Sequence, residues 1–379
     1  MNILILRVSA IGDVVHTLPA IHLLKRLFPD AKISWIVQEK AADLLLDQPL
    51  IERVFVLRNK FLNPKNWRHT YNIIKQLRQT QWDAILDFQG LVKTSALLML
   101  LKGVSYGFNR TLAREGISSW FTNHKTTPCY TNIVQKNLGL ASSLQADSRL
   151  APHLALDYQH CSPTIHELKH DFFLQIPATK KTMVDEWLTK LERPGFIVLA
   201  PNTTWESKRW PTTNWQELLK LLPYSLSEHH VILIGEYFGS QARDLATYCS
   251  GRALKIYRTP KWDLRATSYL ISKSALLIAP DTGLLHLGDY LGIETIGIFG
   301  PTSAKKHGPF FSDTNKKNVI QIPCSHYYQK QHGSEKISCM MQLTPSMLLK
   351  NIKFALKYSS LRQNALSNLA LTKQQPAPF

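Results

Sequence analysis

The sequence contains no apolar run long enough to cross a membrane, because none reaches the roughly 18 residues that a spanning helix needs. Its first residues, MNILILRVSAIGD, have no basic segment before the apolar stretch and no small-residue cleavage site after it. The five cysteines form no CxxC pair, and their odd number argues against a disulfide framework. We therefore expect a cytoplasmic protein.

Several motifs of metal and nucleotide chemistry are also missing. There is no G-x-x-x-x-G-K-[ST] loop and no G-x-G-x-x-G turn, which disfavours P-loop hydrolysis and the usual dinucleotide binding. HExxH and a convincing aspartate cluster are absent as well. A zinc site could be drawn from Cys324, His326, His332 and Cys339, but their spacing is loose and ordinary thiols are the favoured interpretation. We expect neither a metal nor a cofactor.

Positive charge, in contrast, is abundant. The chain carries 45 Lys and Arg against 27 Asp and Glu, a formal net charge of +18. Such a charge predicts an anionic partner, which could be nucleic acid, a phosphorylated substrate or the acidic lipid face of a membrane. The length of 379 residues exceeds the about 250 to 300 at which single cores stop growing, so we expect two domains.

Short apolar runs alternate with helix-like segments along the first half of the chain. NILILRVS, ISWIVQ, ERVFVL and DAILDFQG are typical of strands buried in a parallel sheet. Apolar residues from Val14 to Phe28 recur at helical spacing, although Pro19 is tolerable only near a first turn or at a kink. The segment WRHTYNIIKQLRQ predicts another helix. This alternation favours an α/β fold with a doubly wound sheet.

The pattern loosens around residues 151–195 and then restarts. A probable helix, KKTMVDEWLTKL, precedes three further strands, GFIVLAPN, HVILIGE and ALLIAPD. We expect an N-terminal Rossmann-like domain at 1–175, a second at 176–350, and a C-terminal helix or tail at 351–379 that could return to the first domain. From residue 359 on, the polar sequence is typical of a loosely ordered tail. The strand ends of the two domains would meet at a shared cleft.

Three joints that follow strands carry polar groups. At the first, Asp281, Thr282 and Gly283 open a helix, whose free amides and dipole favour a phosphate; His286 follows on the same helical face. The alternative is that Asp281 merely caps the helix and His286 packs against the domain. Both interpretations stay open.

The other two joints follow the same logic. After the first strand, Gly12 would let a substrate approach while Asp13 projects a carboxylate; the alternative is again a helix cap. In PNTTWESKRWP, Thr203 and Thr204 supply hydroxyls and Lys208 supplies a positive charge suited to a pyrophosphate. A solvated loop lysine is the commoner case.

At these joints the sequence resembles the ADP-heptose lipopolysaccharide heptosyltransferases of glycosyltransferase family 9. The resemblance covers roughly residues 1–350 and is strongest in RVSAIGDVVHTLPAI, DFQGLVKTSAL, TTWESKRWP and DTGLLHL. Within this family the sequence is most similar to heptosyltransferase I, which transfers heptose from ADP-L-glycero-D-manno-heptose to the Kdo region of lipid A. The resemblance implies a GT-B fold of two Rossmann-like domains facing a central cleft, and an inverting reaction that needs no metal.

The resemblance also implies roles. Asp13 matches the general base and Lys208 the lysine that steadies the departing diphosphate. The positions that match the donor site are Thr203, Thr204, Asp281, Thr282, Gly283 and His286. Glu236 or Gln241 falls near the expected ribose contact, and Trp262 could stack under the adenine or pack in the core.

On the acceptor side, the resemblance and the charge point to the first domain. Gly12 and a set of basic residues would meet Kdo carboxylates, lipid A phosphates and the anionic cytoplasmic face of the inner membrane: Arg58, Lys60, Lys65, Arg68, Arg110 and Arg114. Taken singly, each is more often a solvated surface charge.

Two other functions remain as alternatives. The segment PCSHYYQKQHGSEKISCMMQLTP is similar to the cysteine-containing end of heptosyltransferase II, and another nucleotide-sugar transferase would share the same architecture. A non-catalytic basic protein that binds nucleic acid is disfavoured, because no recognised motif is present and the basic residues are dispersed. We expect no nucleic-acid partner.

Overall fold

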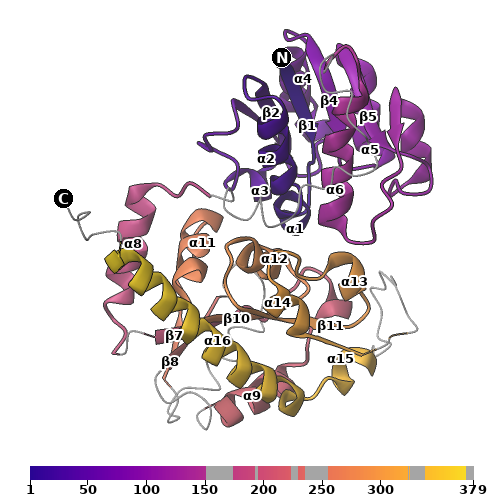
Figure 1. The fold of residues 1–379 in the computed structure, drawn as a ribbon. Helices are drawn as coiled ribbons and strands as arrows, with labels where there is room; N and C mark the ends of the chain where they lie inside the picture. Colours follow the sequence, from indigo (N-terminus) through magenta and orange to yellow (C-terminus); the bar gives the residue numbers. More distant parts are fainter. Residues whose placement is uncertain are drawn as a thin grey trace, which may run out of the picture. The chain divides into compact units, whose positions relative to one another are not determined.

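The computed structural model describes residues 1–150, 174–192, 195–222, 229–234, 255–322, 324 and 338–372. The chain divides into two compact units, Met1–Gln175 and Ile176–Phe379 (Figure 1). Each unit is built on its own parallel sheet, and the predicted α/β class is therefore confirmed.

The sheet of the first unit has six strands in the order β3-β2-β1-β4-β5-β6. They are β1 (Asn2–Leu6), β2 (Lys32–Gln38), β3 (Arg53–Leu57), β4 (Trp82–Asp87), β5 (Gly103–Phe108) and β6 (His124–Thr126). β1 pairs in parallel with β2 and with β4, so that Ile3 lies between Ile33 and Ala84. Because β1 has a strand on each side and helices over its faces, Ile3 to Leu6 are completely buried, as their uninterrupted apolar run predicts.

Short helices connect these strands. They are α1 (Ile11–Val15), α2 (Leu18–Leu27), α3 (Glu39–Ala42), α4 (Trp67–Leu77), α5 (Val92–Ser95) and α6 (Ile133–Ser142), with 3₁₀ turns η1 (Pro64–Asn66), η2 (Ala96–Leu100), η3 (Gly116–Phe121) and η4 (Ser143–Ala146). Residues 11–27 form two helices and not the single helix that the apolar spacing suggested. Pro19 lies in the first turn of α2, where its missing N–H leaves no hydrogen bond unmade.

A buried asparagine stabilises this break. Asn137 of α6 donates from Nδ2 to the carbonyl oxygen of His16 at 2.9 Å and to Oγ1 of Thr17 at 3.2 Å. Both acceptors lie between α1 and α2. The bonds thus satisfy a buried backbone group and fasten α1 to α6.

The second unit repeats the same topology. Its strands lie in the order β12-β11-β10-β7-β8-β9. They are β7 (Gly195–Leu199), β8 (His229–Leu233), β9 (Ile256–Arg258), β10 (Leu276–Pro280), β11 (Thr295–Phe299) and β12 (Val319–Gln321). In both sheets the strand order reverses next to the first strand, between β1 and β4 in one unit and between β7 and β10 in the other. Open α/β sheets bind ligands at such points.

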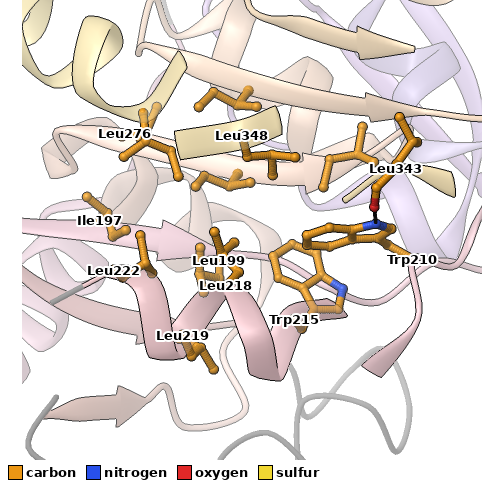
Figure 2. Close-up of a cluster of buried hydrophobic side chains, with 14 of the residues drawn as sticks. Ile197, Leu199, Trp210, Trp215, Leu218, Leu219, Leu222, Leu276, Leu343 and Leu348 are labelled. Carbon is orange, nitrogen blue, oxygen red and sulfur yellow. Dashed lines mark hydrogen bonds between the residues drawn. The ribbon is translucent and has the colours of Figure 1, made fainter. Parts of the chain in front are cut away.

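The helices of the second unit are α8 (Ala178–Leu188), α9 (Thr212–Leu221), α11 (Leu264–Lys273), α12 (Gly283–Tyr290), α13 (Ala304–His307), α14 (Asp313–Lys317), α15 (Ser338–Gln342) and α16 (Pro345–Thr372), with the 3₁₀ turn η5 (Glu206–Lys208). One core cluster joins several of them to the sheet. In Figure 2, Trp210 and Trp215 meet edge to face, with ring centroids 4.8 Å apart, beside leucines of α9, β10 and α16. Trp210 Nε1 also donates to the carbonyl oxygen of Leu343 at 2.7 Å, which satisfies the polar edge of a buried indole.

The C-terminal residues belong to this core. The predicted limit at residue 350 falls inside α16, which packs beside α9 (Figure 1). Leu348, Ile352 and Ala355 are fully buried in the cluster, at the i, i+4, i+7 spacing of one helix face. Of the helix and the tail predicted after residue 350, the structure has the helix as far as Thr372, so the loosely ordered tail expected from residue 359 does not begin before that residue.

We predict that Ile352→Ala destabilises the protein by about 2 to 5 kcal/mol, because it opens a cavity in this core. Phe354→Ala, two residues away but 51% exposed, serves as the control and should cost no more than about 0.5 kcal/mol. Urea unfolding followed by tryptophan fluorescence measures both. Equal losses would mean that Ile352 does not pack in the core.

Candidate functional site

The predicted joints all follow strands at the two points of reversed strand order. Asp13 comes after β1, the segment Thr203–Lys208 after β7, and Asp281 directly after β10. The structure groups their side chains into two clusters, one in each unit. We call them the Asp13 centre (Arg7, Asp13, Asp87, Gln89 and Arg114) and the Asp281 centre (Lys208, Asp281, Thr282 and His286).

Asp13 lies in the first turn of α1, beside Gly12, with 22% of its side chain exposed. One carboxylate oxygen, Oδ1, pairs with Nη2 of Arg7 at 2.9 Å. The other, Oδ2, accepts from the backbone N–H of Ala10 at 3.1 Å and lies 3.6 Å from Nη1 of Arg114. The carboxylate therefore does form the predicted helix-cap bond, yet it also stands between two guanidinium groups and remains open to solvent.

Arg7 is the main residue of this centre that sequence reasoning did not single out. Only 5% of its side chain is exposed, and Nη1 donates to the carbonyl oxygen of Phe88. Burial lowers the pKa of Arg7, whereas the charge of Asp13 acts to raise it. The sequence feature that could have identified Arg7 is its position as the one cation in the apolar run NILILRVS. An arginine buried at the end of a strand needs an anionic partner.

The end of β4 supports Arg7 and the exit of β1. Asp87 accepts from the backbone N–H groups of Gln89 and Gly90 at 2.9 and 3.0 Å, and from the hydroxyl of Ser95 at 2.5 Å. Burial raises the pKa of Asp87, although these bonds and the charge of Arg7 oppose the rise. Gln89 Oε1 accepts from the N–H groups of Val8 and Ser9 at 3.0 and 3.2 Å. Asp87, Gln89 and Ser95 lie in DFQGLVKTSAL, a segment for which the sequence predicts no side-chain role.

In the Asp281 centre a buried carboxylate joins two other groups. Oδ2 of Asp281 lies 2.6 Å from Nζ of Lys208, and Oδ1 lies 3.0 Å from Nε2 of His286. Burial alone would raise the pKa of Asp281, but the hydrogen bond with His286 and the charge of Lys208 prevail and hold it well below its usual range. The side chain of Asp281 is only 6% exposed. It is therefore an ionised carboxylate that anchors the lysine.

Thr282, not Asp281, is the cap of α12. Its Oγ1 accepts from the N–H of Leu285 at 3.5 Å, and Gly283 is the first residue of the helix. The alternative that Asp281 caps this helix is thus wrong. His286 is buried, as the packing alternative expected, and also reaches Asp281.

Lys208 is not a solvated loop lysine. Its side chain is 19% exposed, and Nζ lies 5.0 Å from the centre of the Trp205 ring. Thr203 is buried and donates to the carbonyl oxygen of Trp205 at 2.5 Å, whereas Thr204 is exposed. Trp205 and Asp281 together fix the direction of the ammonium group.

The remaining predicted residues are not gathered at either centre. Trp262 is 8% exposed and meets Trp187 of α8 edge to face at 5.3 Å, so it contributes to packing in the second unit. Glu236 and Gln241 lie outside the described residues, as do His326 and His332 of the zinc alternative. Arg114 does contact Asp13. The other basic residues predicted for the acceptor are exposed on segments of the first unit: Arg58, Lys60, Lys65, Arg68 and Arg110.

The described part of the chain shows neither a metal-binding cluster nor a membrane-spanning helix. Among those residues, no group of three or more His, Cys, Asp or Glu side chains could hold a metal ion. None of the helices found there is long and apolar enough to traverse a bilayer.

The pKa of Asp281 makes stability depend on pH. Because its folded value lies below the about 3.9 of an unfolded aspartate, the ionised form stabilises the protein above about pH 4, and this contribution is lost as the pH falls toward the folded value. We predict that Asp281→Asn reduces the difference in unfolding free energy between pH 5 and pH 3 by about 1 kcal/mol.

Urea unfolding at the two pH values measures this difference. The control is Glu217→Gln, which removes an exposed carboxylate of α9 and should keep the wild-type difference. An unchanged difference in the Asp281→Asn variant would show that this carboxylate is not held ionised by its neighbours.

Several known proteins are similar to this chain over most of its length. The lipopolysaccharide heptosyltransferase 1 of Campylobacter coli is 26% identical over 361 residues, covering 93% of this chain and 98% of that protein. Its counterpart from Escherichia coli K12 is 27% identical over 315 residues, covering 80% and 88%. Among solved structures, E. coli heptosyltransferase WaaC with ADP has a TM-score of 0.68 at 24% identity and covers 94% of this chain and all of that one.

E. coli ADP-heptose heptosyltransferase II has a TM-score of 0.70 at 16% identity, covering 95% of this chain and 100% of that chain. These likenesses show the fold that the sequence resemblance implied. The model of glycosyltransferase family 9 (heptosyltransferase) matches residues 70–338, a range that contains Asp87, Lys208 and the whole Asp281 centre. This protein therefore belongs to glycosyltransferase family 9, the heptosyltransferases.

Proposed function

We propose that this protein is a lipopolysaccharide heptosyltransferase that transfers heptose from ADP-L-glycero-D-manno-heptose to the Kdo region of lipid A. Family membership supports heptose transfer, and the relatives named heptosyltransferase 1, which align over most of the chain, support the first-heptose reaction. The structural observation that carries the proposal is the Asp281 centre: a lysine anchored beside the N-terminus of α12, where an anionic leaving group is favoured.

In the second unit, Lys208 stabilises the diphosphate as it departs. Asp281 does not bind the anion, because its own negative charge would repel it; it orients the Lys208 ammonium, and His286 holds the other carboxylate oxygen. Thr282, the Gly283 end of α12 and the exposed Thr204 supply neutral donors, whereas the hydroxyl of Thr203 is already bonded to the carbonyl oxygen of Trp205. A cation and helix amides can together stabilise a diphosphate without a metal, so we propose a metal-independent reaction.

In the first unit, Asp13 acts as the general base. A partly exposed carboxylate can take the proton from the acceptor hydroxyl while that oxygen attacks the anomeric carbon. Displacement from the face opposite the leaving group inverts the configuration. Arg7 occupies Oδ1, so the base uses Oδ2, which faces Arg114. Arg114 and the exposed basic residues of this unit are suited to the carboxylates and phosphates of a Kdo-lipid A acceptor.

The test is ADP release from ADP-heptose with Kdo-lipid A, in the presence of EDTA. Release that requires the acceptor and survives the chelator supports the proposal in full. Release that appears only with an acceptor already carrying one heptose would assign the protein to the heptosyltransferase II reaction. No release with either acceptor would contradict heptose transfer to this core.

We predict that Asp13→Asn lowers turnover by about 100-fold or more, because the amide cannot accept the proton but preserves the shape of the side chain. ADP affinity should stay near the wild-type value, which calorimetry measures. Asp30→Asn, on an exposed residue of the same unit, is the control and should be fully active. Near-normal turnover of the Asp13 variant would remove this residue from the base role.

We predict that Lys208→Ala reduces kcat/KM by an amount equivalent to about 2 to 4 kcal/mol, because the departing diphosphate loses its cation. Lys190→Ala removes an exposed lysine of the second unit and should leave kcat/KM unchanged. Steady-state assays of ADP release compare the two variants. If both behave alike, the anchored ammonium does not act on the leaving group.

A further inference from the structure

Four large apolar side chains lie exposed on two adjoining 3₁₀ turns of the first unit. Met99 and Leu100 of η2 are 73% and 45% exposed, and Ile117 and Trp120 of η3 are 54% and 70% exposed. η2 and η3 contact each other. We call these four residues the η2–η3 patch. Their neighbours Leu97, Leu98 and Phe121 pack into the core of the unit, so the patch sits on a well-anchored base.

The stretch of chain that carries the patch is predominantly basic. Between Gln89 and Trp120 the sequence holds four basic residues, Lys93, Lys102, Arg110 and Arg114, and all four are exposed. The single acidic residue of this stretch, Glu115, accepts from the backbone N–H of Val92 at 2.7 Å. Exposed apolar groups on a stretch of chain rich in exposed cations suit the surface of an anionic bilayer, which offers an apolar interior beneath negative headgroups.

The patch is fastened to the Asp13 centre. The N–H of Glu115 donates to the carbonyl oxygen of Gly90 at 2.9 Å, so η3 begins beside the end of β4. Gly90 has a φ of +59°, and a Cβ at this position would lie 3.2 Å from the backbone nitrogen of Arg114. Arg114, just before η3, in turn lies 3.6 Å from Asp13. A membrane surface that contacted Ile117 and Trp120 would therefore be separated from Asp13, the proposed base, only by Arg114 and the start of η3.

We propose that the η2–η3 patch docks this protein on an anionic phospholipid bilayer, with Met99, Leu100, Ile117 and Trp120 entering the interface and Lys93 and Lys102 meeting the headgroups. Docking there brings the Asp13 centre close to the headgroup layer. The use of this position for a lipid-anchored acceptor rests on the proposed function. The docking on a bilayer is independent of that function.

The experiment measures sedimentation of the full chain with vesicles of phosphatidylcholine, with and without phosphatidylglycerol. The wild type should bind the anionic vesicles, less tightly as salt rises. Ile117→Ser/Trp120→Ser should bind them at least about tenfold more weakly, since two large apolar groups no longer leave water. The matched control is Trp67→Ser/Tyr71→Ser, which alters two residues of α4 that are 59% and 65% exposed and should change binding by less than about twofold.

Transfer assays separate this proposal from the proposed function. The patch variant should retain wild-type transfer to a water-soluble, deacylated Kdo acceptor, and lose transfer to the same acceptor with its acyl chains embedded in vesicles. A wild type that binds no vesicles, binds neutral ones equally well, or loses binding through the α4 variant would overturn docking by the patch. A wild type that binds vesicles but transfers heptose to neither acceptor would overturn the proposed function alone.

Discussion

β1 and β10 carry no charged residue along their length because they are buried on every side, and this constraint places the chemistry of the protein at their ends. β1 and β10 are flanked by other strands and covered by helices, and their residues from Ile3 to Leu6 and from Leu276 to Pro280 are buried. The first charged groups that the chain can present come where these strands end, at Arg7 and at Asp281. Because parallel strands end at the same edge of a sheet, charged groups that follow them lie close together and can pair.

Each centre pairs a buried ion with a more exposed one, and the sign of the buried ion differs between the two. In the first unit the cation Arg7 is the buried partner and the carboxylate of Asp13 reaches solvent. In the second unit the carboxylate of Asp281 is buried and the ammonium of Lys208 is the more exposed group. A buried ion is stable only with its partner in place, so each exposed group is held in one direction by the buried one. The first arrangement suits proton acceptance and the second suits contact with an anion.

Sequence patterns predicted β1 to β4, β7, β8 and β10 and the joints that follow β1, β7 and β10, because an all-apolar run is typical of a buried strand. β5, β6, β9, β11 and β12 were not predicted. The patterns did not predict the pairings, since Lys208 and Asp281 are 73 residues apart and nothing local relates them. Arg7 was overlooked because a single arginine gives no sign of its partner. The sequence predicted a first turn or a kink at Pro19 without choosing between them, and it left a helix or a tail open after residue 350, because the polar composition there opposed the helical spacing of Leu348, Ile352 and Ala355. The roles of the exposed basic residues stay predictions.

The hydrogen bonds from Asn137 of α6 to His16 and Thr17 constrain how the sequence can vary. Asn137 donates to Thr17 Oγ1, and Thr17 Oγ1 donates to the carbonyl oxygen of Asp13 at 2.9 Å. Asn137, which lies 120 positions from Thr17 in the sequence, thereby helps to fix the backbone conformation at Asp13, the proposed base. A change at Asn137 removes a donor to the buried carbonyl oxygen of His16, whereas the Thr17 hydroxyl would keep its bond to Asp13. Asn137 is therefore constrained by the backbone that carries the base, although it lies far from that backbone in the sequence.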